Sequence, residues 1–173
     1  MRQKPVPTGR ETSFGEDEII VSKTDLKGKI VYCNKVFIRV AGYPEAELIG
    51  APHSIIRHPE MPRAVFKLLW DTIAAKREIF AYVLNMDAHG NGYWVLAHVT
   101  PSLSDDGQVI GYHSNRRKPT ASAVDKARAL YRDLLAIEKA PPSRKDGMAA
   151  AYDELVSRLN LMKLDYDEFA LSL

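Results

Sequence analysis

Runs of β-prone residues stand at both ends of a stretch of about 100 residues, and the part between them has helical spacing. Such an order excludes a helical bundle and predicts an α+β domain with five antiparallel strands, because short Gly- and Asp-containing turns join neighbouring runs. The predicted strands are Ile19–Lys23, Ile30–Cys33, Ile79–Met86, Tyr93–Leu103 and Val109–Asn115.

The middle stretch predicts several short helices and one longer helix. A helix that starts at Asn34 is stopped by Gly42, and a second one, from Pro44, ends at Gly50. Three prolines keep residues 51–62 irregular, and Pro62 then begins a helix that ends near Lys76. With all helices on one face of the sheet, we expect a cavity between the helices and the strands.

The length of 173 residues is enough for one main domain and an appendage. Residues 1–17 are rich in Pro, Gly, Thr and charge and predict a tail or loose cap; residues 18–119 form the predicted domain. Residues 120–173 predict a C-terminal helical extension, with amphipathic segments at 124–139 and 148–164. The apolar face of the first of these segments can pack against the domain itself or against a second copy of the chain in a homodimer.

Composition and charge exclude several classes of protein. The net charge of +2 is scattered, so we expect no nucleic-acid surface. The cluster of Arg116, Arg117 and Lys118 could touch phosphate, but we interpret it as a solvated strand end. The single cysteine, Cys33, forbids an intramolecular disulfide and fits a reducing compartment. We find no signal peptide and no apolar run long enough for a membrane span, and therefore expect a cytoplasmic protein.

Two sequence motifs carry a family resemblance. Gly-Tyr-Pro-Glu-Ala-Glu-Leu-Ile-Gly at 42–50 resembles a segment found in many PAS domains. The continuation is similar to the PAS domain of the aerotaxis-receptor family, and the resemblance runs from about Ile19 to Arg117. It is carried by Gly-Ala-Pro-His at 50–53, Arg-His-Pro-Glu-Met-Pro at 57–62, Phe66, Leu69-Trp70, Asn85, Gly90 and Tyr93-Trp94.

The resemblance implies a PAS fold that binds FAD non-covalently and reports redox, oxygen or energy state to a signalling partner of the chemoreceptor or kinase type. Two positions depart from the family pattern. Glu60 replaces the usual Asp, and Phe80-Ala81-Tyr82 replaces a Trp followed by a small residue. By motif, the implied cofactor-binding residues are Asn34, His53, Arg57, His58, Glu60, Phe66, Trp70 and Asn85.

The polar residues of this set suit different parts of FAD. Arg57 can bind phosphate oxygens in a bidentate manner, and His53 and His58 can donate to phosphate, stack on adenine or cap a turn. Glu60 would accept from a neighbouring donor or a ribose hydroxyl, or would only precede the following helix. Asn85 shares a strand face with Val83, where an inward amide can meet the flavin edge or serve as a buried structural group.

The aromatic residues have a structural alternative. Phe66 and Trp70 lie four residues apart on one helix face, where they can wall the flavin or simply fill the core. For Trp94 we favour core packing. Cys33 ends a strand, whereas light-sensing flavin domains hold their adduct-forming cysteine in a helical turn, so we expect no blue-light photocycle.

Two other functions stay open. One is a haem-binding gas sensor with His53, His58 or His98 as axial ligand, and the other is a cofactor-free interaction module. We find neither a catalytic constellation nor a spacing of His89 and His98 suited to a closed metal site, and expect no enzyme. In the flavin hypothesis, reduction alters the hydrogen bond at Asn85 and, through the strands, the helix at 124–139.

Overall fold

The computed structural model of the chain describes residues 4–173. Its five strands form one antiparallel sheet in the order β2-β1-β5-β4-β3, so that the first and last strands of the chain lie side by side. This arrangement confirms the predicted α+β class and the five-stranded sheet. The strands are β1 (Ile20–Thr24), β2 (Ile30–Cys33), β3 (Ile79–Met86), β4 (Gly92–Leu103) and β5 (Val109–Arg117).

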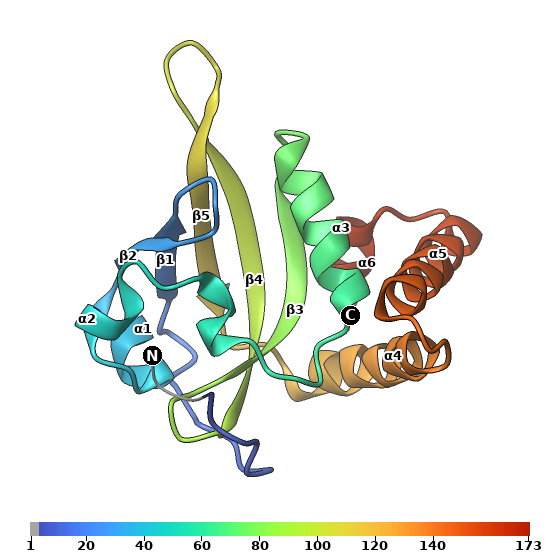
Figure 1. Ribbon diagram of the computed structural model, residues 1–173, viewed down its shortest axis with the longest axis horizontal. Helices are drawn as coiled ribbons and strands as arrows, with labels where there is room; N and C mark the ends of the chain where they lie inside the picture. Colours follow the sequence, from blue (N-terminus) through green and yellow to red (C-terminus); the bar gives the residue numbers. More distant parts are fainter. Residues whose placement is uncertain (1–3) are drawn as a thin grey trace.

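Four helical segments connect β2 to β3. Local chemistry sets the bounds of the first one, since the Asn34 side chain accepts from the backbone N–H of Phe37 and Gly42 adopts a left-handed conformation (φ 68°). Prolines precede the other three segments. The segments are α1 (Lys35–Ala41), α2 (Glu45–Leu48), the 3-10 helix η1 (His53–Ile56) and α3 (Arg63–Ala74). In Figure 1, α1 and α2 lie near β1 and β2, while α3 lies beside β3.

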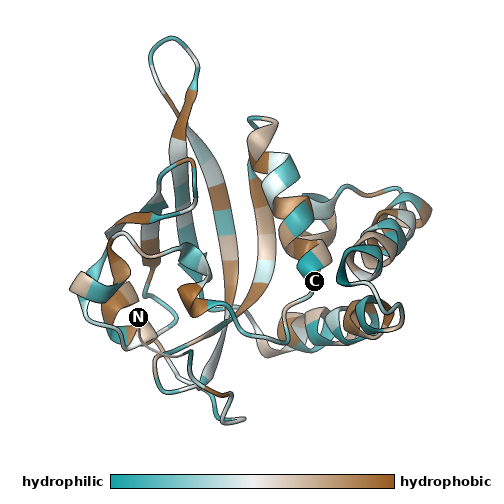
Figure 2. Cartoon of the chain, viewed as in Figure 1, coloured by the Kyte–Doolittle hydropathy of each residue, from teal (hydrophilic) through white to brown (hydrophobic). Residues whose placement is uncertain are grey.

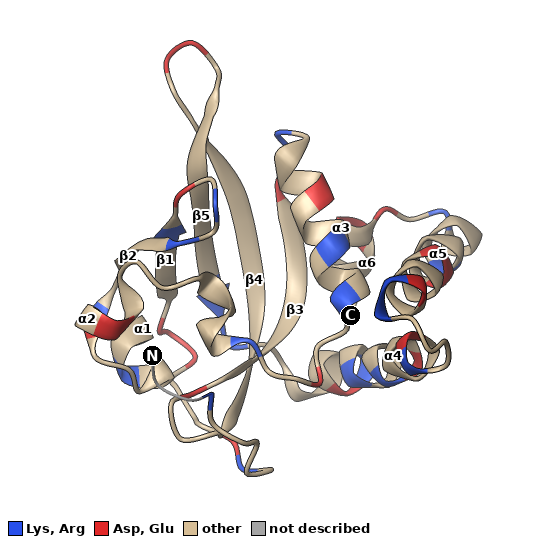
Figure 3. Cartoon of the chain, viewed as in Figure 1, with Lys and Arg blue, Asp and Glu red and all other residues tan. Residues whose placement is uncertain are grey.

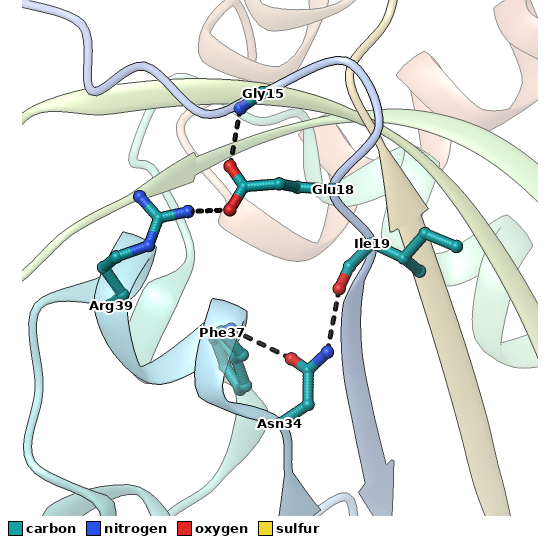
Figure 4. A network of polar contacts seen from close by, with 6 residues as sticks. All are labelled: Gly15, Glu18, Ile19, Asn34, Phe37 and Arg39. Carbon is teal, nitrogen blue, oxygen red and sulfur yellow. Dashed lines mark hydrogen bonds and ion pairs between the residues drawn. The ribbon is translucent and has the colours of Figure 1, made fainter.

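Asn34 joins the entry of β1 to α1, as Figure 4 shows. Its Oδ1 accepts from the backbone N–H of Phe37 (2.9 Å) and Val21 (3.1 Å), and its Nδ2 donates to the carbonyl of Ile19 (2.8 Å). Close by, an ion pair joins Arg39 to Glu18. The Asn34 side chain therefore makes three hydrogen bonds with local backbone groups.

Residues 4–17, expected as a tail or loose cap, lie along the turn between β3 and β4. Thr8 and Thr12 donate backbone hydrogen bonds to the carbonyls of Gly90 and Gly92, at 2.9 and 2.8 Å. Phe14 is buried and meets Tyr93 edge-on at a centroid distance of 6.5 Å. Docking on the sheet supplies the contacts that this polar segment lacks by itself.

Three helices follow the sheet and lie beside β3 and α3 (Figure 1): α4 (Ala121–Lys139), α5 (Arg144–Met162) and α6 (Tyr166–Ser172). Hydrophilic and hydrophobic residues are interspersed along α4 and α5 (Figure 2), and both helices carry residues of both charges (Figure 3). None of the helices in residues 4–173 has the length and apolar character that a membrane crossing requires. The helical C-terminal part was predicted, but α6 was not.

Helix α4 packs on the face of the sheet opposite α3, α6 lies along β3, and α5 packs against α3 and α4. Tyr131 of α4 stacks against Trp94 of β4 at 6.0 Å between centroids, and its hydroxyl donates to the carbonyl of Tyr82 in β3 (2.6 Å). On α6, Asp167 accepts from the backbone N–H of Phe80 (2.7 Å), which would otherwise be free on this edge strand. Trp94 is thus a packing residue, as we expected.

Candidate functional site

A cavity of about 290 Å³ lies between the sheet and the helices α3 and η1. Alternation along β3 and β4 turns Val83, Asn85, Ala97 and Val99 toward it, while the intervening side chains point to the other face of the sheet. Its size is near the lower end of the range for small-ligand pockets. The predicted space between helices and strands is therefore real and largely apolar at its floor.

Five of the eight predicted site residues line this cavity, namely His53, Arg57, Phe66, Trp70 and Asn85. The other three do not line it. Asn34 caps α1, His58 is buried behind η1 and accepts at Nδ1 from the backbone N–H of Glu60 (3.1 Å), and the Glu60 side chain is exposed.

Backbone pairing brings Arg57 and Asn85 together. The segment after η1 runs along the free edge of β3, where Arg57 forms an antiparallel bridge with Asn85, and the N–H of His58 donates to the Leu84 carbonyl (3.4 Å). Asn85 is 3% exposed, and its Nδ2 is buried without a hydrogen-bond partner within residues 4–173. A buried amide donor left unpaired in a cavity wall is a site for an acceptor on a ligand.

Arg57 and Phe66 form a stacked pair in the wall. The guanidinium carbon of Arg57 lies 3.7 Å from the centroid of the Phe66 ring. Burial, together with the nearby Arg63, lowers the pKa of Arg57, while Glu138 opposes that shift. Lys4 lies near Arg57, and its Nζ donates to the carbonyl of Ser54 (3.4 Å). Burial, and secondly the positive charge of Arg57, lower the pKa of Lys4.

Trp70 lies at the rim, where it is 40% exposed and meets Tyr112 of β5 edge-on at 5.5 Å. Gly28 in the turn between β1 and β2 has a positive φ of 74°, and a Cβ there would lie 3.2 Å from the Trp70 ring. These three residues come from α3, β5 and the β1–β2 turn. They bound the cavity on the side of that turn.

The sequence interpretation missed Arg116. It is 2% exposed and lines the cavity, whereas its neighbours Arg117 and Lys118 are exposed as expected of a strand end. The interpretation of Arg116 as solvated was wrong. Alternation along β5 contained the signal, because it puts Arg116 on the same face as Tyr112 and Ser114.

The charges around the cavity are of one sign. Lys27, Arg57 and Arg116 line it, and no aspartate or glutamate of the described chain does. His53 adds no charge, because burial and then Arg116 lower its pKa to about 3, so its imidazole is neutral at pH 7. The lining therefore fits a ligand that is partly planar and apolar, accepts hydrogen bonds and carries negative charge.

The three histidines named above as possible haem ligands, His53, His58 and His98, gain little support from the structure. His98 lies on the opposite face of the sheet, stacked on Phe80 and joined to Glu78 (2.6 Å), and His58 does not line the cavity. His53 does line it, but its Nε2 is 3.0 Å from the Ser22 hydroxyl. In the described chain, no group of three or more His, Cys, Asp or Glu is arranged to hold a metal.

The single cysteine is buried at the end of β2 and does not line the cavity. Burial is the main cause that raises the pKa of the Cys33 thiol, with Glu45 contributing in the same direction. A protonated thiol outside the pocket is a poor nucleophile toward a bound ligand.

Comparison with known proteins places these features in a family. Residues 30–116, about half of the chain, match the family described as PAS fold. The chain is 35% identical over 134 residues to the aerotaxis receptor of Escherichia coli (strain K12), across 78% of this chain and 26% of the receptor. It is 25% identical over 111 residues to a nitrogen fixation regulatory protein of Klebsiella oxytoca, across 64% of this chain and 22% of that protein.

Among solved structures, the light state of the blue-light photoreceptor Aureochrome1 LOV superimposes with a TM-score of 0.56 at 24% identity, over 66% of this chain and 89% of that one. This likeness bears on the fold alone. The chain spans about a quarter of the length of the two curated relatives. With the sheet order, the cavity and the family match in agreement, the chain belongs to the PAS-fold family.

Proposed function

We propose that the chain is a flavin-binding PAS sensor, not an enzyme, and that FAD is its cofactor. The observation that carries this proposal is the cavity wall itself, which combines an unpaired buried amide at Asn85 with three cations and no carboxylate among the described residues. The similarity to the Escherichia coli aerotaxis receptor supports it. A flavin bound there would supply redox chemistry.

The lining residues suit different parts of the cofactor. Asn85 would donate its Nδ2 hydrogen to an acceptor on the isoalloxazine edge, and Val83, Ala97 and Val99 would contact the apolar part of the ring. The cavity is too small for a whole FAD, so part of the cofactor would extend past Trp70 or Arg57 toward solvent. Arg57 would then bind phosphate oxygens.

The remaining members of the predicted set would act indirectly. Asn34 fixes Phe37, whose ring packs against His53 at 6.1 Å between centroids, and His58 with Glu60 shapes the turn that presents Arg57. We propose that His53 contacts the ligand as a neutral imidazole. The three residues outside the lining hold those inside it in place.

The absorption spectrum of the purified protein, before and after supplementation with FAD, tests the proposal. We expect the visible bands of an oxidised flavin, their loss on reduction with dithionite, and release of FAD, separated from FMN by chromatography, on denaturation. A Soret band would contradict the flavin and indicate haem. A colourless protein that takes up no FAD would leave only the interaction module.

Two pairs of variants test the assigned residues. Asn85→Ser should weaken FAD binding by about fivefold and Arg57→Ala by about 10- to 100-fold, the usual effects of losing one neutral and one charge-assisted hydrogen bond. The matched controls are Asn115→Ser, on the other face of β5, and Arg117→Ala, which is exposed. Equal losses in variants and controls would contradict the assignment.

We further propose that α4–α6 pass the state of the cavity to a signalling partner of the chemoreceptor or kinase type, or to a second copy of the chain. The support is that α4 contacts both walls, through Tyr131 on β3 and Glu138 on α3. Hydrogen exchange of residues 121–139 should differ between oxidised and reduced protein, while the β4–β5 turn near Gly107 serves as the control. Identical exchange would contradict this route, and sedimentation would identify a dimer.

A further inference from the structure

Arg116 is a buried cation whose neighbours carry no negative charge. Its Nη2 donates to the Ser22 hydroxyl (2.5 Å), its Nη1 is 3.5 Å from the neutral His53 ring, and its guanidinium carbon lies 4.6 Å from the centroid of the Phe37 ring. Its Nε is buried with no hydrogen-bond partner within residues 4–173. No carboxylate of the described chain forms an ion pair with it.

Such an arrangement is costly for the protein alone. Charged groups are rarely buried without an opposite charge, because removal from water is not offset by neutral partners. Burial lowers the pKa of Arg116 to about 10, which still leaves it protonated at pH 7. The fold thus keeps a fixed positive charge inside the cavity although nothing in the described chain balances it.

The position of the guanidinium connects it to other unpaired polar groups on the same face of the sheet. Burial raises the pKa of the Tyr93 phenol, and the nearby Arg116 opposes that rise. Tyr93 pairs with Asn85 across β4 and β3, and its hydroxyl is also buried without a hydrogen-bond partner among residues 4–173. Among the four unsatisfied polar side-chain atoms buried in residues 4–173, those of Asn85, Tyr93 and Arg116 therefore lie on one face of the sheet, and the fourth is Nε2 of His113.

The charge of Arg57 is less buried than that of Arg116. Arg57 is stacked on Phe66, lies near Lys4, and is only half-buried, so solvent screens its charge. Arg116, at 2% exposure, is screened far less. The two arginines are therefore suited to different charges, an outer one for phosphate and an inner one for a group enclosed by the sheet.

We propose that Arg116 is the counter-charge for a negative group held within the cavity. This proposal rests on the flavin proposed above, and the negative group is then the isoalloxazine ring. On reduction the ring takes up two electrons from a donor such as dithionite and one proton at N5. The ring then carries one negative charge shared by N1 and the C2 oxygen, and the Arg116 guanidinium stabilises this form relative to the neutral oxidised ring.

The first test needs no cofactor. Arg116→Met removes the charge while keeping an unbranched side chain, and the urea unfolding of the flavin-free protein is compared with that of wild type. Because the charge is uncompensated, we expect the variant to be at least as stable as wild type. A loss of stability equal to that of Phe37→Ala, a core truncation beside it, would show that Arg116 is a structural residue and would overturn the proposal.

The second test measures the midpoint potential of bound FAD by equilibration with reference dyes. Arg116→Met should lower the potential, corresponding to at least a roughly tenfold loss in the preference for reduced over oxidised flavin, the effect of a charge-assisted hydrogen bond. Arg116→Lys should restore much of it, and the exposed Arg117→Met is the matched control. An unchanged potential in Arg116→Met would overturn the proposal.

The outcomes separate this inference from the proposed function. If wild type binds no flavin, the proposed function fails, and the stability test alone decides whether the cavity holds an uncompensated charge. If wild type and Arg116→Met bind FAD at the same potential, the flavin sensor stands and the role of Arg116 falls. If Arg116→Met loses FAD but Arg116→Lys retains it, the need for the charge is supported directly.

Discussion

Glu138, near the end of α4, caps the first turn of α3. Its Oε1 accepts from the backbone N–H of Ala64 (2.8 Å) and its Oε2 from Nε of Arg63 (3.1 Å). Helix α3 begins after Pro62 without a side-chain cap of its own, so a residue 74 positions away satisfies an N–H that would otherwise be unpaired. The helix that supplies Phe66 and Trp70 to the cavity is thereby tied to the C-terminal helices.

Replacement of Glu138 tests this tie. Glu138 is 6% exposed, and Glu138→Gln removes its charge beside Arg63, so we expect a loss of about 1–3 kcal/mol in the free energy of unfolding. The control is Glu154→Gln, whose ion pair with Arg158 is partly exposed and should cost at most about 0.5 kcal/mol. Urea titrations measure both, and equal losses would contradict the capping role.

Tyr131 ties α4 to β3 in the same way. Its hydroxyl donates to the Tyr82 carbonyl (2.6 Å) and lies 3.0 Å from the hydroxyl of Tyr166 in α6. Tyr131→Phe keeps the ring stacked on Trp94 but removes these bonds, and should cost about 1–2 kcal/mol. Tyr152→Phe, on the partly exposed face of α5, is the control and should change the unfolding free energy by less than about 0.5 kcal/mol.

The turn between β1 and β2 gives a prediction about the rim of the cavity. Gly28→Ala places a Cβ at a positive φ and 3.2 Å from the Trp70 ring, whereas Gly107→Ala, at φ 78°, meets open space. Both variants should lose about 1 kcal/mol from backbone strain. Only Gly28→Ala should lose more than this in unfolding free energy and shift the tryptophan fluorescence, because only its Cβ meets Trp70. Equal losses in the two variants, without a fluorescence shift, would contradict close packing of Gly28 against Trp70.

Much of the fold is local in origin and was predictable. Asn34 and Gly42 set the ends of α1 through capping and a left-handed φ, and β3 has the predicted bounds because its run of apolar and β-prone residues is uninterrupted. Helix α6 was missed, since a segment of seven residues depends on contacts such as Asp167 with the edge of β3.

The candidate site likewise contains residues that local sequence could predict and one residue, Arg116, whose burial it could not. Motif similarity and alternation identified Asn85, Arg57 and the aromatic pair on α3, because these follow from local order along the chain. The burial of Arg116 depends on Ser22, His53 and Phe37, which come from three other elements. Alternation along β5 places Arg116 and Arg117 on opposite faces, but it does not show that distant elements enclose the side chain of Arg116.

His53 gives the pH dependence of stability. Its pKa is about 3 in the folded protein, mainly because it is buried and secondarily because of Arg116, against 6.5 for the free side chain. Between these values the unfolded chain binds a proton that the folded chain does not, so the free energy of unfolding falls as the pH is lowered from about 6.5 toward 3, by up to about 1.4 kcal/mol per pH unit. Burial lowers the pKa of His58 too, which adds to the effect.

His53→Gln removes this titration and should flatten the fall in stability below pH 6.5, while the part contributed by His58 persists. His89→Gln, at an exposed position in the β3–β4 turn, is the control and should leave the pH profile as in wild type. Urea unfolding at intervals between pH 7 and pH 4 measures the three profiles. Parallel profiles for wild type and His53→Gln would mean that His53 is accessible to protons in the folded chain, and the neutral imidazole beside Arg116 would have to be abandoned.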